Sequence, residues 1–321
     1  MQAKLSTRAF LRSAIAAVGF AAGRFTVGGS ELEENHINRL EIGGGVIEVK
    51  FDPDAFDLPA NRIIEWVTNA ARAVVAYYGI FPVRRLRVSI ESSDEQTGVF
   101  HGTTWGRTPP VTRIFVGRHT TQDQLAADWM MTHEMVHTAF PDVPEEHHWI
   151  EEGIATYVEP IARVQAGQLS ADKIWSDMAN GMPQGEPRAG DVGLDHTHTW
   201  GRTYWGGALF CLNADVQIRL ASQNRVGLQQ ALRGIQQAGG TIETNWNIEK
   251  AFLIGDMSTR TGVLRKLYGE MKDKPVTIDL NSLWRNLGVQ VLANGQISFN
   301  DHALWAATRL SVTAPVEPDA L

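Results

Sequence analysis

The residues that point most directly to a chemistry are His133, Glu134 and His137, which stand in the order His-Glu-Met-Val-His. On an α-helix, two histidines four positions apart lie on one face, with Cβ atoms about 5–6 Å apart, so both imidazoles can reach one metal ion. This spacing suits zinc. Glu134 is too close in sequence to His133 to be a comfortable third ligand, but it is well placed to take a proton from a water molecule on the metal. The motif predicts the metal centre of a hydrolase.

The residues around this motif favour a metal site over a pair of ordinary core histidines. Apolar residues recur at helical spacing on both sides of the histidines, at Leu125, Ala126, Trp129, Met130, Val136 and Phe140. A single buried histidine is often satisfied by hydrogen bonds in a protein core. Two histidines on one apolar turn would cost desolvation energy twice unless they share a partner such as a cation. We therefore expect both side chains to bind one ion.

A zinc centre of this kind needs a third protein ligand and leaves its fourth position to water. Pro141 and Pro144 are expected to end the first helix, and residues 149–157 predict a second helix that begins soon after them. Glu151 and Glu152 both stand in its first turn. Glu152 lies nearly opposite the helix's main apolar face, among small residues that permit close approach of another helix. Periodicity does not choose between the two carboxylates, and either could be a solvated charge favoured by the helix dipole.

At this point the residues resemble a known family. HEMVH followed by WIEEGIATY is similar to the gluzincin metallopeptidases, and the spacing is closer to the glycyl aminopeptidase-like group than to aminopeptidase N. In that family the glutamate directly before the glycine is the third metal ligand, which implies that role for Glu152. A second block resembles the group's Y-x-x-G-A-L segment and its following D-x-x-I-R helix, at residues 204–209 and 215–219. The resemblance runs from about residue 95 to the C-terminus and implies that Tyr204 stabilises an oxyanion during catalysis.

The resemblance implies a zinc-dependent metallopeptidase with one Zn²⁺ ion, a peptide or protein substrate, and Glu134 as general base. The chain is too short to hold the PDZ domain and the long β-rich N-terminal domain of the larger group members. It also has no clear G-x-M-E-N-like stretch for a substrate's free amine, so aminopeptidase and endopeptidase activity both stay open. The alternatives are a catalytically silent zinc-binding or scaffold protein and a zinc hydrolase of a non-peptide amide. Retention of Glu134 favours catalysis, because a structural metal site needs its ligands but not the base.

Other residues near the motifs carry weaker expectations. The segment 98–104 is interpreted either as the edge strand along which a substrate backbone lies, by strand addition, or as an ordinary hairpin strand. His147 and His148 do not fit the metzincin ligand spacing. We interpret them as loop residues or as residues that contact a metal ligand without binding the metal, one of which could orient that ligand. His196 and His198 are interpreted as loop residues, with a hydrogen-bonding role as the alternative.

Composition agrees with an enzyme. The chain has 321 residues, of which 43% are hydrophobic, and this allows a sizeable core. Its net charge of −7 argues against nucleic acid as a partner. Cys211 is the only cysteine, so no internal disulfide can form. Lys4, Arg8 and Arg12 precede an apolar run at 13–23 that has the length of a signal-peptide core and is too short to span a bilayer. We expect export to the periplasm or the extracellular space, with an uncleaved N-terminal membrane anchor as the alternative. The oligomeric state is not predicted.

Hydrophobic periodicity predicts an α+β protein, and the expected arrangement of its elements is similar to the thermolysin-like architecture. The expected division is a signal peptide and linker at 1–30, an α+β upper lobe ending in the zinc helix at 31–140, a mainly helical lower lobe at 141–314 and a loose tail at 315–321. Strands are expected at 46–51, 86–91 and 113–117. Helices are expected at 59–78, 149–166, 202–222, 226–238, 246–254, 258–272 and 279–287. Asn294 and Gly295 suggest a hairpin turn.

Overall fold

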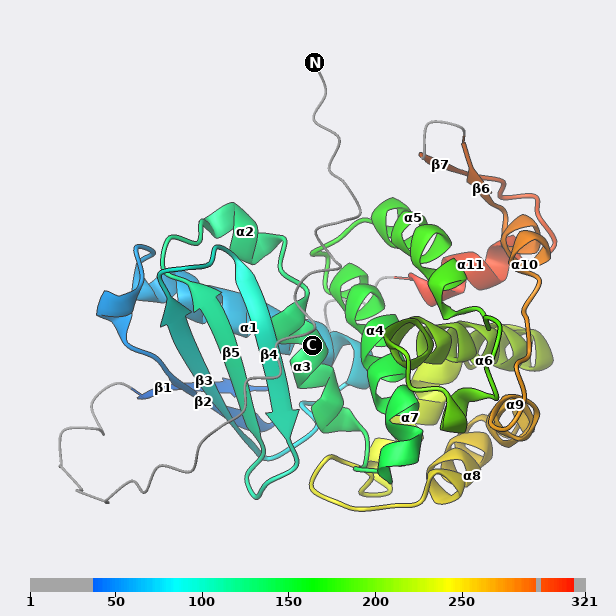
Figure 1. The fold of residues 1–321 in the computed structure, drawn as a ribbon, viewed down its shortest axis with the longest axis horizontal. Helices are drawn as coiled ribbons and strands as arrows, with labels where there is room; N and C mark the ends of the chain where they lie inside the picture. The colour runs from blue at the N-terminus through cyan, green and yellow to red at the C-terminus, as the bar shows by residue number, and fades with distance from the viewer. Residues whose placement is uncertain (1–36, 293–295, 315–321) are drawn as a thin grey trace.

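The structure is a computed structural model that describes residues 37–292 and 296–314. The predicted signal peptide, the Asn294-Gly295 turn and the tail from residue 315 lie outside the described residues. The described chain forms a small sheet with one long helix beside a larger group of helices (Figure 1). Helices α3 (Met130–Val136) and α4 (His148–Gln165) lie where the two parts meet. This arrangement confirms the predicted α+β class, with a sheet-bearing upper lobe and a mainly helical lower lobe.

Five strands form the sheet of the upper lobe in the order β1-β2-β3-β5-β4. Their bounds are Ile37–Ile42 for β1, Gly45–Lys50 for β2, Arg85–Ser93 for β3, Val99–Trp105 for β4 and Val111–Gly117 for β5. The strands β2, β3 and β5 are parallel, whereas β1 and β4 pair antiparallel with their neighbours. Strand β4 therefore lies at one edge of the sheet and forms a hairpin with β5, a position that agrees with both interpretations of residues 98–104. The sequence had not indicated β1.

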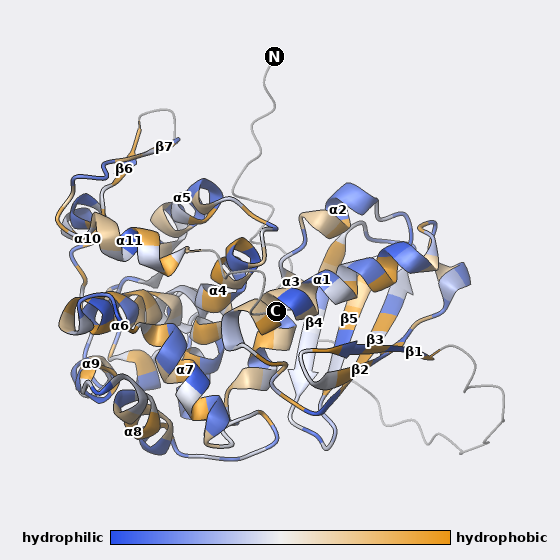
Figure 2. Cartoon of the chain, turned by 180° about the vertical axis from the view of Figure 1, so that it is seen from behind, coloured by the Kyte–Doolittle hydropathy of each residue, from blue (hydrophilic) through white to orange (hydrophobic). Residues whose placement is uncertain are grey.

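One face of the sheet is apolar because buried and exposed residues alternate along its strands. Ile47 pairs with Leu86, and Ile90 pairs with Ile114, and all four side chains are buried. The helix α1, Ala60–Tyr78, crosses this face and connects the parallel strands β2 and β3 (Figure 2). It ends where expected, at Gly79, whose φ of 86° is a left-handed conformation that favours glycine.

The helix that carries HEMVH is shorter than the sequence predicted. The apolar stripe suggested one helix from about residue 125, but the chain forms a separate α2, Gln122–Ala126, before α3, Met130–Val136. Asp128 lies between them and accepts hydrogen bonds from the main-chain N–H groups of Met130 and Met131, at 3.0 and 3.1 Å. An aspartate that caps the new helix in this way competes with continuing the old one.

Most of the lower lobe is helical, and most of its helices lie at the predicted ranges. Its helices are α4 (His148–Gln165), α5 (Ala171–Gly181), α6 (Gly207–Ser222), α7 (Leu228–Gln237), α8 (Ile248–Thr259), α9 (Val263–Met271), α10 (Leu280–Leu287) and α11 (Ala306–Val312). A π-helical turn, Gly201–Gly206, leads into α6. The strands β6 (Val289–Val291) and β7 (Ile297–Phe299) pair antiparallel, as expected for a hairpin. The sequence had not indicated α5 and α11.

The boundary between α8 and α9 was predicted wrongly. A helix expected to end near residue 254 continues to Thr259, and the next one begins at Val263 instead of 258. Arg260 ends α8 in the left-handed conformation, with φ 55°. Arginine seldom adopts that conformation, so the residue type that ends α8 does not itself mark the break.

Two glycines set the distance between α4 and the start of α6. A Cβ atom added to Gly153 would overlap the main chain of Gly207, and one added to Gly207 would overlap the carbonyl oxygen of Trp149. The two helices therefore touch through their backbones at this point. Since Gly153 follows Glu152 directly and Gly207 follows Tyr204 by three residues, the contact also brings those two side chains toward one another.

We expect Gly153→Ala to lower the free energy of unfolding by about 1–3 kcal/mol, because the added methyl group must push two packed helices apart. Chemical denaturation of the purified protein measures this. Gly269→Ala is the matched control, since Gly269 is an exposed glycine of α9 with no atom within 4 Å of an added Cβ. It should leave stability unchanged or raise it by about 0.5–1 kcal/mol. Equal effects of the two substitutions would contradict the close contact.

Candidate metal centre

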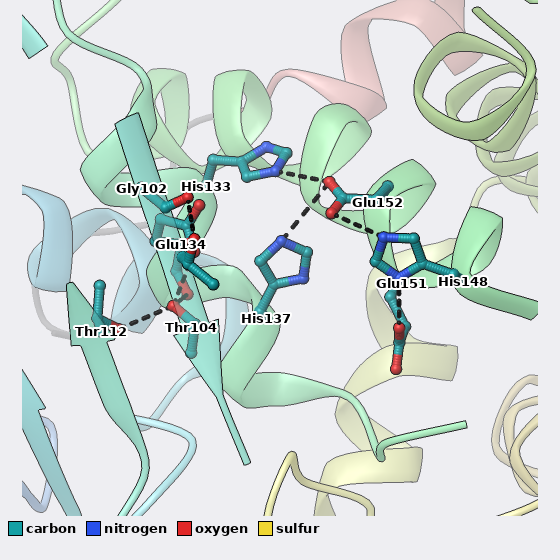
Figure 3. A network of polar contacts seen from close by, with 10 residues as sticks. Gly102, Thr104, Thr112, His133, Glu134, His137, His148, Glu151 and Glu152 are labelled. Carbon is teal, nitrogen blue, oxygen red and sulfur yellow. Dashed lines mark hydrogen bonds and ion pairs between the residues drawn. The ribbon is translucent and has the colours of Figure 1, made fainter. Parts of the chain in front are cut away.

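Three side chains that the sequence singled out meet at the junction of the two lobes. His133 and His137 come from α3 and the turn that follows it, and Glu152 comes from α4 (Figure 3). One ligand atom from each residue lies within 4.8 Å of the others. Glu152 Oε2 is 3.0 Å from His133 Nε2 and 3.7 Å from His137 Nε2. The structure thus places both imidazoles of HEMVH around one carboxylate oxygen.

This donor set fits a divalent zinc ion. Two imidazole nitrogens and one carboxylate oxygen are the three protein ligands found in one class of catalytic zinc sites. Burial lowers the pKa of His137 to about 4, so its ring is neutral near neutral pH and can offer a lone pair. Burial raises the pKa of Glu152, but the neighbouring His137 and His133 outweigh it and hold that pKa well below its ordinary value. The carboxylate is therefore ionised, which is the form that binds a metal.

Glu134 lies beside the three donors but faces the sheet instead of joining them (Figure 3). Its carboxylate Oε2 accepts a hydrogen bond of 2.8 Å from the hydroxyl of Thr104 on β4. The same hydroxyl lies 2.8 Å from Thr112 Oγ1 on β5 and 3.0 Å from the main-chain oxygen of Glu134. Burial raises the pKa of Glu134 to about 7. A carboxyl group with this pKa can both accept and return a proton near neutral pH.

The edge strand β4 fits closely against Glu134. A Cβ atom added to Gly102 would lie 2.8 Å from Glu134 Cγ and 2.9 Å from its Oε1. Only glycine leaves room for the carboxylate at this position. Gly102 and Thr104 face the same side of β4, because successive strand residues alternate between faces. The strand therefore holds the carboxylate through one contact and one hydrogen bond.

Thr104→Val should lower kcat by about 10- to 100-fold, because it removes a hydrogen bond to a charged group while keeping the side chain's shape. Thr104→Ser should keep most of the turnover, since serine retains the hydroxyl. Zinc content should be equal in both variants, because Thr104 contacts none of the three donors among the described interactions. Steady-state kinetics on a test peptide, the substrate class that the sequence resemblance implies, and metal analysis of each preparation measure this. A valine variant with the activity of the serine variant would contradict it.

Tyr204 lies in the π-helical turn Gly201–Gly206 and stacks against His133, with ring centroids 6.2 Å apart. Trp200 also stacks with Tyr204, with ring centroids 5.7 Å apart. Burial, with the charges of Glu152 and Glu134, raises the pKa of Tyr204. The phenol therefore keeps its proton and can donate a hydrogen bond beside the donors. Rare π-turns of this kind occur often at functional sites.

The other histidines take different places. His147 is buried, and its Nδ1 lies 3.1 Å from Asp195 Oδ1, an oxygen to which Trp149 also donates. His196 is exposed and pairs with Asp273 at 2.8 Å, and His198 is exposed as well. None of these three histidines belongs to the group of metal donors.

His148 is the histidine that contacts a donor. Its Nε2 is 3.3 Å from Glu152 Oε1, and its Nδ1 is 3.0 Å from Glu151 Oε2. Hydrogen bonds to these two carboxylates raise the pKa of His148 to about 10, so the ring is protonated and both nitrogens donate. Glu151 therefore contacts His148, whereas Glu152 contacts the two histidines of the motif.

Sequence reasoning missed Thr104 as the partner of Glu134 and Thr112 as the partner of Thr104. The pairing of β4 with β5 places Thr104 opposite Thr112 and Gly102 opposite Ile114. The sequence did contain one indication that Gly102 and Thr104 act together. They are two residues apart and therefore share a face of any strand. Which face of β4 contacts α3 depends on how the helix packs, and no local sequence pattern indicates it.

Comparisons with known proteins support the fold. No protein-family model matches the chain, and no curated protein matches it. An aminopeptidase N family protein from Idiomarina loihiensis has a similar structure, with a TM-score of 0.58 and 14% sequence identity, over 80% of this chain and 49% of that one. An M1 zinc metallopeptidase from Deinococcus radiodurans aligns with a TM-score of 0.48 and 13% identity, over 76% of this chain and 52% of that one. The chain spans about half the length of these solved structures.

The likeness to the Idiomarina protein shows the fold: over most of its length, the chain has the fold found in about half of that aminopeptidase N family protein. Among the described residues, no helix has both the length and the apolar character needed to cross a membrane.

Proposed function

We propose that this chain is a zinc-dependent metallopeptidase that hydrolyses peptide bonds. The observation that carries the proposal is the convergence of His133, His137 and Glu152 on one point, with the carboxylate of Glu134 held beside them. The likeness of the fold to that of an aminopeptidase N family protein supports it. We name His133, His137 and Glu152 as the ligands of one Zn²⁺ ion.

Zinc, when bound, would act as a Lewis acid and make a water molecule acidic enough to attack a carbonyl at neutral pH. Glu134 would accept the proton of the attacking water at its carboxylate and later deliver it to the leaving amine. The hydrogen bond from Thr104 orients that carboxylate. Tyr204 would donate its phenolic proton in a hydrogen bond to the oxyanion that forms on the substrate carbonyl.

The position of Glu134 favours this proposal over a silent zinc-binding or scaffold protein. A structural site requires its ligands but no base, whereas here Thr104, itself paired with Thr112, and Gly102 hold a fourth side chain next to the donors. A buried carboxylate costs stability unless its interactions compensate for lost hydration. Such a cost is expected at a site shaped by catalysis.

Digestion of a peptide library tests the proposal, with cleavage products identified by mass spectrometry. We expect cleavage that a zinc chelator stops and that added zinc restores. Products that begin only at free amino ends would assign aminopeptidase activity, and cuts within long peptides would assign endopeptidase activity. The Glu134→Gln variant, purified in parallel, shows whether a contaminating peptidase causes the cleavage. No chelator-sensitive cleavage of any library member would overturn the proposal.

We also propose that the protein is exported, on the basis of the basic and apolar residues near its N-terminus. Cell fractionation tests this. A periplasmic or secreted product that has lost about the first 30 residues is expected, and a full-length product confined to the cytoplasm would overturn it.

A further inference from the structure

The two carboxylate oxygens of Glu152 have different neighbours. Oε2 faces the ring nitrogens of His133 and His137, at 3.0 and 3.7 Å. Oε1 faces the ring nitrogen Nε2 of His148, at 3.3 Å (Figure 3). One oxygen thus points to the proposed metal position, and the other is held away from it.

His148 is itself held in place. Its second ring nitrogen, Nδ1, donates to Glu151 Oε2 at 3.0 Å. The other oxygen of Glu151, Oε1, accepts a hydrogen bond of 3.1 Å from the main-chain N–H of Val143. Because residues 148, 151 and 152 lie within one turn of α4, their side chains can form these contacts without any change in the backbone.

These contacts form a chain that fixes the proposed ligand from outside. It runs from the main chain of Val143, in the loop after α3, through Glu151 and His148 to Glu152 on α4. These contacts link the loop that follows the two donor histidines to α4, the helix that carries the donor Glu152. The side chain of Glu151 is 17% exposed and that of His148 is 42% exposed. His148 is therefore open enough to be replaced without leaving a cavity in the core.

We propose that His148 is a positioning residue that orients the Glu152 carboxylate for metal binding, and that Glu151 acts by holding His148. This inference rests on the proposed zinc function. A carboxylate whose second oxygen is fixed has fewer orientations to lose when its first oxygen binds a metal. Removing a residue that orients a metal ligand in this way commonly weakens metal binding by about 10- to 100-fold.

The test measures the affinity of the full-length protein for zinc alone, by competition with a chromophoric chelator. We expect His148→Ala to bind zinc about 10- to 100-fold more weakly than the wild type. Glu151→Gln should weaken binding less, because His148 keeps its contact with Glu152. The double variant should be no weaker than His148→Ala, since Glu151 acts through His148. His196→Ala is the matched control. It also removes a histidine paired with a carboxylate, at 2.8 Å from Asp273, but it should leave zinc affinity unchanged.

The outcomes separate this inference from the proposed function. Zinc affinity of His148→Ala within twofold of the wild type would overturn the inference and leave the zinc function standing. A double variant much weaker than His148→Ala would also overturn it, because Glu151 would then act by another route. A wild-type protein that binds no zinc, or binds it equally well after His137→Ala, would overturn the proposed function first. Thermal unfolding of each zinc-free variant shows that a change in affinity does not come from unfolding.

Discussion

Glu134→Gln should lower kcat by about 10⁴-fold, the upper end of what one positioned acid–base group contributes, while zinc binding stays intact. Glutamine has nearly the shape of glutamate and can still accept the hydrogen bond from Thr104, which is 2.8 Å long in the native protein. It cannot accept a proton from the attacking water. The metal donors are unchanged, because the proposed ligands are His133, His137 and Glu152.

Turnover of a cleaved peptide and zinc content per chain, measured on the same preparation, check this expectation. Glu145→Gln is the control, since it makes the same chemical change at an exposed glutamate just before α4. The control should retain full activity. If Glu134→Gln turned over substrate as fast as the wild type, Glu134 would not be the general base. If it lost zinc, its effect on turnover would not report on proton transfer.

The sequence predicted the two helices that bring the metal donors together, because each carries a strong periodic pattern. It did not distinguish Glu151 from Glu152 by pattern alone. Adjacent residues of a helix point about 100° apart, and the choice depends on the direction from which α3 approaches α4. The family resemblance indicated Glu152, and the structure places that carboxylate, not Glu151, within reach of both histidines. Tertiary packing decides between two residues that are equivalent by local rules.

The residues that orient Glu134 and Glu152 could not be predicted for the same reason. Thr104 meets Glu134 across thirty residues of sequence, and only the edge position of β4 brings them together. His148 directly precedes the WIEEG segment, and the sequence named it as one of two candidates for orienting a ligand. The sequence did not show which carboxylate each ring nitrogen faces. Local sequence specifies the elements well. Contacts between elements depend on packing and register, which local patterns do not record.

The π-helical turn at Gly201–Gly206 shows a further limit of periodicity. The sequence predicted one continuous helix over 202–222, and the ranges agree, but a π-turn has a wider hydrogen-bond spacing than an α-helix. Side chains before Gly207 are therefore rotated relative to those that an ideal α-helix would give. This rotation contributes to placing Tyr204 against His133, at 6.2 Å between ring centroids.

Tyr204→Phe should lower kcat by about 10²- to 10³-fold, the effect expected when one donor to an oxyanion is lost. Phenylalanine keeps the ring that stacks with His133 and with Trp200, so the local packing is preserved. KM should change little, because the hydrogen bond to the oxyanion forms in the transition state and not in the bound substrate. Zinc affinity should match the wild type, since the phenol is not one of the three metal donors.

Kinetics of Tyr204→Phe at saturating zinc, compared with Tyr78→Phe, distinguish a catalytic phenol from a packing residue. Tyr78 is buried in α1, and its hydroxyl has no hydrogen-bond partner among the described residues, so its removal should leave kcat unchanged. If both variants kept full turnover, the oxyanion would be stabilised by another group. If Tyr204→Phe raised KM and left kcat unchanged, the phenol would bind substrate and transition state equally, and its place beside His133 would serve recognition instead of rate.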